Sequence, residues 1–426
     1  MSQQVIVSFS LFGLMFLFLA GGLPIAICLG LSAALTLWFF DIAPIELSVQ
    51  MIMTSLDSFV LLAIPFFILA GTIISESSIG SRLVDFFNAI FGRIPGGLAI
   101  TSVFTCFLFG GLTGSAAAET AAVTSIMSEP MDRHGYPRHF TASLIAAAST
   151  TANLVPPSIA LILYGVLAKQ SISDLFLAGV VPGLVITILL AAGAVAISRL
   201  RGYGTDHVME RQPLGKAALR AGWALVAPVL ILGGIRLGIF TPTESAIFVT
   251  LYALFVAIYI YRDITWRDVP RIFERAAVVA TSVMFIVATA TLFAWIINSQ
   301  GIPGFVSNLL LSSGGSDTVI LLSMLGLLIV TGMFLDATST LFILLPILFP
   351  VALGIGMDPI HFGVFMIMAL NLGLITPPVG LCLFVGANIA GAPVLKVAAA
   401  AVPWMAIMIV AILLVAFIPF LTLALL

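Results

Sequence analysis

The sequence predicts an all-α integral membrane protein made of two inverted repeats, each with a re-entrant hairpin and a helix broken by a Pro-Pro pair. Three observations lead to this prediction: the composition, the distribution of basic residues, and an order of motifs that recurs in the two halves. Of the 426 residues, 61% are hydrophobic and 8% are charged, whereas a soluble domain carries about 25% charged residues. The mean hydropathy of +1.25 leaves too little polar surface to face water. Soluble enzymes and nucleic-acid-binding proteins are therefore excluded.

Ten long apolar segments predict membrane crossings, because a backbone in hydrocarbon must satisfy its own hydrogen bonds and does so as a helix. The short alternating segments of a membrane β-barrel do not occur. The predicted crossings are residues 5–22, 23–40, 58–76, 140–168, 175–198, 222–240, 244–261, 276–298, 362–392 and 399–426. No Lys or Arg precedes Arg82, so the apolar start is interpreted as a retained span rather than a signal peptide.

The basic residues set the orientation. If the basic residues of the loops between these spans are cytoplasmic, only Lys169 and Arg236 lie elsewhere, and the positive-inside bias is strong. Both chain ends then face outward. Residues 199–221 form the longest polar segment and are interpreted as a cytoplasmic linker between the halves; binding of lipid headgroups is an alternative role for their charge.

Three motifs recur in the same order in the two halves. The pairs are GYPRHF (135–140) with GMDPIHF (356–362), NLVPPS (153–158) with NLGLITPPVG (371–380), and FGGLTGSAAAET (109–120) with VTGMFLDATST (330–340). The predicted topology has span 58–76 and its counterpart 276–298 running in opposite directions. Inverted repeats with interrupted helices are typical of secondary transporters that bind their substrate near the middle of the membrane.

Two further apolar stretches are predicted to enter the membrane and return. Residues 95–131 lie between Arg93 and Arg133, so both ends are cytoplasmic, and the glycines near Thr113 permit a turn. Residues 317–356 repeat this arrangement from the outside. Non-helical backbone at this depth persists only where it is buried in protein or lines a cavity.

The Pro-Pro pairs predict cation sites. Two consecutive prolines open a helix and free backbone carbonyls, which together with Asn, Ser and Thr oxygens suit a small hard cation such as Na⁺. A simple proline kink is the alternative. The first predicted Na⁺ site comprises Gly111, Thr113, Gly114, Ser115, Asn153 and Pro156, and the second comprises Gly332, Asp336, Thr338, Asn371, Thr376 and Pro377. The substrate is expected between the two tips, at Ser115, Ser339, Asn153 and Asn371. No Cys or His has the spacing of a transition-metal site.

Two carboxylates are placed deep in the membrane by this map. Asp336 lies in the second predicted tip, which favours a role near a coupling ion. Glu119 follows the first tip and anchors that tip to its surroundings in an alternative interpretation.

Together, ITPPVG (375–380), NLVPPS, the Thr113–Ser115 tip, GIFTPTESA (238–246) and the GMFLDATS tip resemble the large membrane subunit of tripartite ATP-independent periplasmic (TRAP) transporters. The resemblance covers nearly the whole chain. It implies a Na⁺-coupled importer of organic acids, such as C4-dicarboxylates or sialic acids, in the bacterial inner membrane, with neither enzymatic activity nor an organic cofactor. It also implies a small four-helix membrane subunit and a periplasmic substrate-binding protein as partners.

An elevator-type transport domain on a scaffold follows from the same resemblance. The expected parts are scaffold spans at 1–57; a first repeat at 58–198 with hairpin 95–131 and broken helix 140–168; the linker 199–221; scaffold spans at 222–275; and a second repeat at 276–426 with hairpin 317–356 and broken helix 362–392. Two alternatives remain: a stand-alone Na⁺/dicarboxylate symporter and a passive channel of similar architecture.

Overall fold

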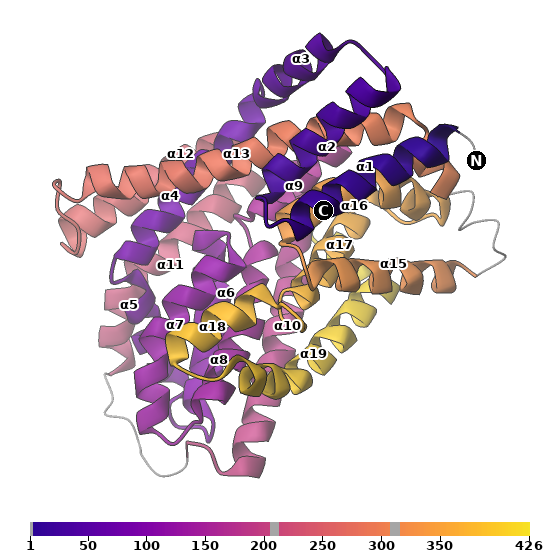
Figure 1. Cartoon of the computed structure of the whole chain (residues 1–426). Coiled ribbons are helices and arrows are strands. Elements are labelled where there is room, and N and C mark those ends of the chain that lie inside the picture. The colour runs from indigo at the N-terminus through magenta and orange to yellow at the C-terminus, as the bar shows by residue number, and fades with distance from the viewer. Residues whose placement is uncertain (1–2, 205–212, 307–315) are drawn as a thin grey trace.

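The computed structural model describes residues 3–204, 213–306 and 316–426, and the regular structure of these residues is helical throughout (Figure 1). The elements before the first hairpin are α1 (Gln3–Ala20), α2 (Ile25–Phe40), α3 (Ile45–Leu56), the 3-10 helix η1 (Phe59–Leu62), α4 (Ala63–Glu76) and α5 (Ile79–Phe91). Among the described residues, seven helical segments are long and apolar enough to cross a membrane. They are Phe59–Glu76, Ile172–Arg201, Leu214–Arg236, Pro242–Ile260, Val269–Ser299, Ala337–Gly354 and Val394–Phe417.

Each predicted hairpin is a pair of helices joined by a short tip. The first consists of α6 (Gly97–Thr113) and α7 (Ala116–Arg133), and the second of α15 (Asp317–Gly332) and α16 (Ala337–Gly354). The first tip turns at Gly114, whose φ of +62° is a left-handed conformation that glycine adopts without strain. The hairpin predictions are confirmed.

Both predicted broken helices are interrupted at their Pro-Pro pairs. The first consists of α8 (Arg138–Ser149), the 3-10 helix η2 (Thr150–Asn153) and α9 (Ile159–Ala168); the second consists of α17 (Pro359–Gly373) and α18 (Leu381–Ala390). Neither proline of a pair can donate a backbone hydrogen bond, which explains why each helix stops before the pair and restarts after it.

The two broken helices run in opposite directions. At one end, the Tyr164 hydroxyl near the end of α9 donates a 2.5 Å hydrogen bond to the Pro359 carbonyl at the start of α17. At the other end, a methyl group on Gly391, just after α18, would lie 3.6 Å from the Arg138 guanidinium at the start of α8. The start of each broken helix therefore meets the end of the other, as inverted repeats require.

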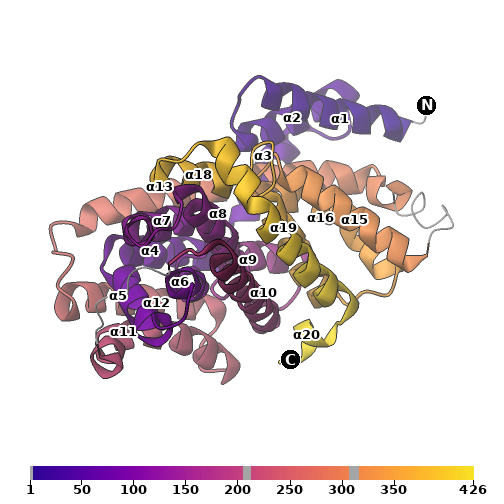
Figure 2. The same ribbon diagram turned by 90° about the horizontal axis from the view of Figure 1, so that it is seen from below.

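The remaining helices surround this central pair. They are α10 (Ile172–Arg201), α11 (Leu214–Arg236), α12 (Pro242–Phe255) with the π-helical turn η3 (Val256–Ile260), α13 (Val269–Ser299), α19 (Val394–Phe417) and α20 (Phe420–Leu423). The long helix α13 packs against α2, α3, α4 and α16, and α12 packs along α4. In Figure 2, α1 and α2 form one edge of the molecule and α11 and α12 lie toward another.

The GIFTPTESA motif forms the start of α12. The Thr241 hydroxyl accepts a hydrogen bond from the Glu244 backbone, and the Glu244 carboxylate accepts one from the Thr241 backbone at 2.8 Å. This reciprocal pair is a capping box, which satisfies backbone donors that a helix start leaves free. Pro242 in the first turn needs no donor there. A structural requirement thus accounts for this motif.

Helices occupy both described ends of the predicted linker 199–221. Helix α10 continues through Arg201, and α11 begins at Leu214 directly after Pro213, so Lys216 and Arg220 lie on helix α11 rather than in a loop. Residues 205–212 lie outside the described residues. The boundaries of the five expected parts stay predictions.

Candidate functional site

A cavity of about 330 Å³ lies where the two hairpin tips meet α4 and α13. The first hairpin and first broken helix form one wall, and the start of α16 contributes from the second hairpin. Its polar lining residues are Thr72, Ser75, Thr113, Ser115, Asn153, Asp336 and Thr338. The cavity thus joins residues of both predicted sites.

Four helices begin at this cavity. Each of α7, α9, α16 and α18 contributes its capping residue or a residue of its first turn, namely Ser115, Ile159, Asp336 and Leu381. Helix N-termini carry free backbone N–H groups and the positive end of the helix dipole. Among the described residues that line the cavity there is no Lys, Arg or His. The positive ends of four helix dipoles therefore face the cavity, and the Asp336 carboxylate is the acidic group among its lining residues.

The first tip lies directly on the first Pro-Pro break. A methyl group on Gly111 would lie 2.9 Å from the Pro156 carbonyl oxygen, and one on Gly114 would lie 2.9 Å from that of Pro157. The Thr113 hydroxyl is buried and has no hydrogen-bond partner. The structure therefore brings together the residues predicted for the first site and leaves one oxygen unpaired.

The second tip presents a carboxylate. Asp336 caps α16 by accepting hydrogen bonds from the backbone of Thr338 at 3.0 Å and of Ser339 at 3.2 Å. Ser339 also donates its hydroxyl to Asp336 and is fully buried. Asp336 and Thr338 line the cavity, whereas Ser339 lies behind them. The predicted residue Ser339 therefore supports Asp336.

The other residues of the second predicted site do not line the cavity. A methyl group on Gly332 would lie 3.1 Å from the Leu370 carbonyl oxygen and 3.2 Å from the Gly373 Cα, so this tip rests on the end of α17. The Thr376 hydroxyl donates to the Leu372 carbonyl, and Pro377 is exposed. The second break is thus open where the first is buried.

The two repeated asparagines meet between the broken helices. The Asn153 amide donates to the Asn371 amide oxygen at 2.7 Å. Asn153 lines the cavity, while Asn371 is fully buried and its amide nitrogen has no partner. Sequence analysis selected both residues but not their contact. Because both asparagines begin the repeated motif, their equivalent positions are the sequence signal that could have predicted the contact.

Sequence analysis missed the wall formed by α4 and α13. Thr72 and Ser75 of α4 and Val279 and Val283 of α13 line the cavity. Gly71 packs so closely that a methyl group there would lie 3.0 Å from the Thr113 Cα. The pairing of these two helices as counterparts in the inverted repeats was the sequence signal that could have predicted this wall.

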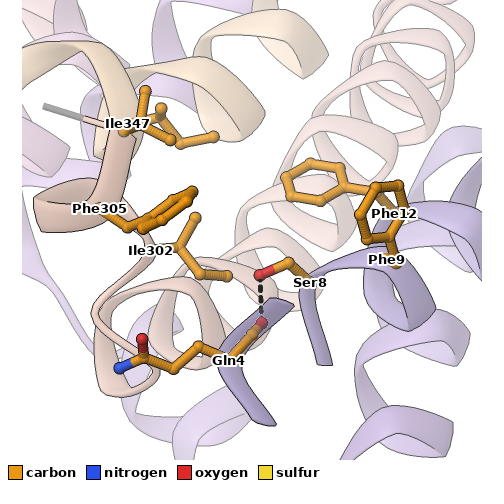
Figure 3. A pocket seen from close by; sticks show the side chains of 8 residues that line it. Gln4, Ser8, Phe9, Phe12, Ile302, Phe305 and Ile347 are labelled. Atoms are coloured by element: carbon orange, nitrogen blue, oxygen red, sulfur yellow. Dashed lines mark hydrogen bonds between the residues drawn. The ribbon is translucent and has the colours of Figure 1, made fainter. Parts of the chain in front are cut away.

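A second hollow lies elsewhere and carries little chemistry. It measures about 280 Å³ and lies between α1 and the 302–306 segment, as Figure 3 shows. Phe9, Phe12 and Phe305 dominate it, and the Ser8 hydroxyl is already bonded to the Gln4 carbonyl at 2.6 Å. The described lining contains no charged residue.

A sequence profile described as "Tripartite ATP-independent periplasmic transporter, DctM component" matches residues 12–421. The chain belongs to this family. The protein is accordingly a multi-pass protein of the inner membrane and a transport protein rather than an enzyme.

Two relatives and one solved structure are similar to this chain. It is 39% identical to the C4-dicarboxylate TRAP transporter large permease protein DctM of Pseudomonas aeruginosa, over 93% of each chain. It is also 39% identical to the 2,3-diketo-L-gulonate TRAP transporter large permease protein YiaN of Escherichia coli, over 85% of each chain. The crystal structure of the Alcanivorax borkumensis YdaH transporter has a similar fold, with a TM-score of 0.65 and 14% identity over 87% of each chain.

Proposed function

We propose that this protein is the large permease of a Na⁺-coupled, binding-protein-dependent importer that carries an organic acid through the cavity between the two hairpin tips. The convergence of four helix N-termini on that cavity carries the proposal. A carboxylate entering the cavity meets the positive ends of four helix dipoles, because these helices begin at its wall. The relatives' names specify C4-dicarboxylates and 2,3-diketo-L-gulonate, both of which are organic acids.

The coupling ion is proposed to bind beside the first tip. Its ligands are oxygens of Gly111, Thr113, Gly114, Ser115, Asn153 and Pro156. The last carbonyls of α6 have no partner within the helix, and the buried Thr113 hydroxyl is unpaired. Hard oxygen ligands of this kind suit Na⁺.

A second Na⁺ is proposed at the second tip. The Asp336 carboxylate, the Thr338 hydroxyl and the Gly332 carbonyl are its proposed ligands, supported by the place of Asp336 and Thr338 in the cavity wall. Asn371, Thr376 and Pro377 stay predicted ligands on the α17 side of this tip.

The substrate is proposed to bind Ser115 and Asn153 directly, because both line the cavity. Asn371 holds Asn153 in place, and Ser339 holds Asp336. Of the four residues predicted to bind substrate, two are thus proposed contacts and two are proposed supports.

An elevator motion and two partners complete the proposal. The hairpins and broken helices pack on one another, and α4 and α13 form the opposite wall of the cavity, which is the division a moving domain requires. The described connection between α9 and α10 spans only residues 169–171. High-affinity capture of a dilute acid is therefore assigned to a periplasmic substrate-binding protein, with a small four-helix subunit completing the scaffold.

Reconstitution tests this function. The chain and its small subunit are placed in vesicles, an inward Na⁺ gradient is imposed, and uptake of a labelled organic acid is measured with and without the binding protein. Saturable uptake that needs both the gradient and the binding protein is expected. Equal uptake without the binding protein would favour the stand-alone symporter, and linear, Na⁺-independent flux would favour the channel.

A further inference from the structure

Glu119 in α7 is a buried carboxyl group without a charged partner. Its side chain is fully inaccessible to solvent, and neither carboxyl oxygen has a hydrogen-bond partner of ordinary geometry. The ion pairs between described residues join Arg133 with Glu129, Arg138 with Asp132, and two arginines with Glu76. None of these pairs reaches Glu119. An ionised carboxylate in such a place lacks both water and a counter-charge.

Among the described residues, the helices around Glu119 turn no basic side chain toward it. The Cys106 thiol of α6 and the Ser149 hydroxyl of α8 flank the carboxyl group and lie 3.5 Å from each other. From α18, the Cys382 thiol lies near the same group and interacts with the hydroxyl of Thr120 in α7. The two thiols are thus the titratable groups that the described neighbouring helices turn toward Glu119.

The carboxyl group packs directly against Gly110 of α6. A methyl group added to Gly110 would lie 2.5 Å from the Glu119 Oε2 and 2.8 Å from the Ala152 Cα. A hard cation needs several oxygen ligands around it. In addition, the described residues contain no cluster of three or more His, Cys, Asp or Glu that could hold a metal. A proton needs neither space nor a coordination shell.

We propose that Glu119 is a proton-binding site and is carried in this conformation as a neutral carboxylic acid, with Ser149 and Cys106 as its polar neighbours. Loss of the proton requires water to reach the group, and therefore requires the first hairpin to separate from η2. Ala118 and Asn153, which line the cavity, are each next in sequence to a residue at this site, Glu119 and Ala152. Protonation of Glu119 is therefore linked to the contact between the first hairpin and the first broken helix. The inference goes beyond the proposed function and does not depend on it.

Infrared difference spectroscopy at neutral pH tests the proposal directly. The wild-type protein is compared with Glu119→Gln, and Glu129→Gln is the matched control, because Glu129 lies in the same helix but is exposed and paired with Arg133. The expected result is a protonated-carboxyl C=O band that shifts in D₂O, is absent from Glu119→Gln and is retained in Glu129→Gln. Loss of ionised-carboxylate bands in Glu119→Gln, with no change in the protonated region, would overturn the proposal.

A second variant covers the case in which Glu119→Gln does not fold. Glu119→Asp keeps an acid at the site with altered surroundings, so the protonated C=O band should move in frequency rather than disappear. An unchanged band in Glu119→Asp would show that the band belongs to another group and would equally overturn the proposal.

Discussion

At the scale of single residues, the chemistry of the cavity depends on side-chain oxygens in its wall that have hydrogen-bonding capacity left over. Thr113 is the clearest case, because its hydroxyl is buried at the first tip with no hydrogen-bond partner. A buried, unpaired hydroxyl is costly unless a ligand uses it. The Thr113 hydroxyl is therefore a proposed ligand of the coupling ion.

The first prediction concerns Thr113→Val, which keeps the shape of the side chain and removes the oxygen. The Na⁺ concentration for half-maximal uptake should rise several-fold, because one ligand worth roughly 1 kcal/mol or more is lost. Thr105→Val is the matched control: Thr105 lies in the same helix and its hydroxyl is also buried and unpaired, but it does not line the cavity. Similar Na⁺ curves for the two variants would remove Thr113 from the ion site.

The second prediction separates charge from helix capping at Asp336. Asparagine caps helices about as well as aspartate, so Asp336→Asn should retain folding while the Na⁺ dependence of uptake weakens or is lost. Asp358→Asn is the control, because Asp358 caps α17 in the same way, at 2.8 Å from the Ile360 nitrogen, and lies outside the cavity lining. If Asp336→Asn transports with unchanged Na⁺ coupling, Asp336 is a structural cap.

At the scale of helices, close backbone contacts hold the tips on the broken helices. Gly373 of α17 and Gly332 at the second tip approach so closely that a methyl group on Gly373 would lie 2.5 Å from the Gly332 Cα. Neither backbone can move without displacing its helix. The contact should therefore tolerate no side chain at either position.

The third prediction follows from this contact. Gly373→Ala should lower the stability of the purified protein by about 1–3 kcal/mol, the usual cost of overpacking, and should reduce transport. Gly326→Ala in α15 is the control, since a methyl group there meets nothing within 4 Å and alanine favours helix. Thermal unfolding of both variants in the same detergent measures the difference. Equal melting temperatures would contradict the predicted close contact.

The helices also show what the sequence could predict. Hairpin turns and helix breaks depend on the local sequence, mainly on Gly and Pro. The tips near Thr113 and Asp336 and both Pro-Pro breaks could therefore be predicted from the sequence. The contact of Asn153 with Asn371 joins residues far apart in the chain. The exposure of Pro377 and the wall formed by α4 likewise depend on tertiary packing, which no local pattern encodes.

At the scale of the whole molecule, the inverted repeats place one cavity between the two tips. The antiparallel broken helices and the two hairpins bring four helix N-termini to that cavity, and these N-termini are the feature proposed to attract the organic acid. The repeats are not equivalent in detail, because the first break is buried and the second is exposed.

The measurement that tests this account most directly is the accessibility of a cysteine placed in the cavity wall. Ala118 is exposed and lines the cavity, and the native cysteines are all buried. In the reconstituted complex, Ala118→Cys should react with a membrane-impermeant maleimide, and Na⁺ together with substrate should protect it. Phe305→Cys in the apolar hollow is the control and should react without protection. Equal labelling of Ala118→Cys with and without Na⁺ and substrate would contradict the assignment of this cavity as the transport site.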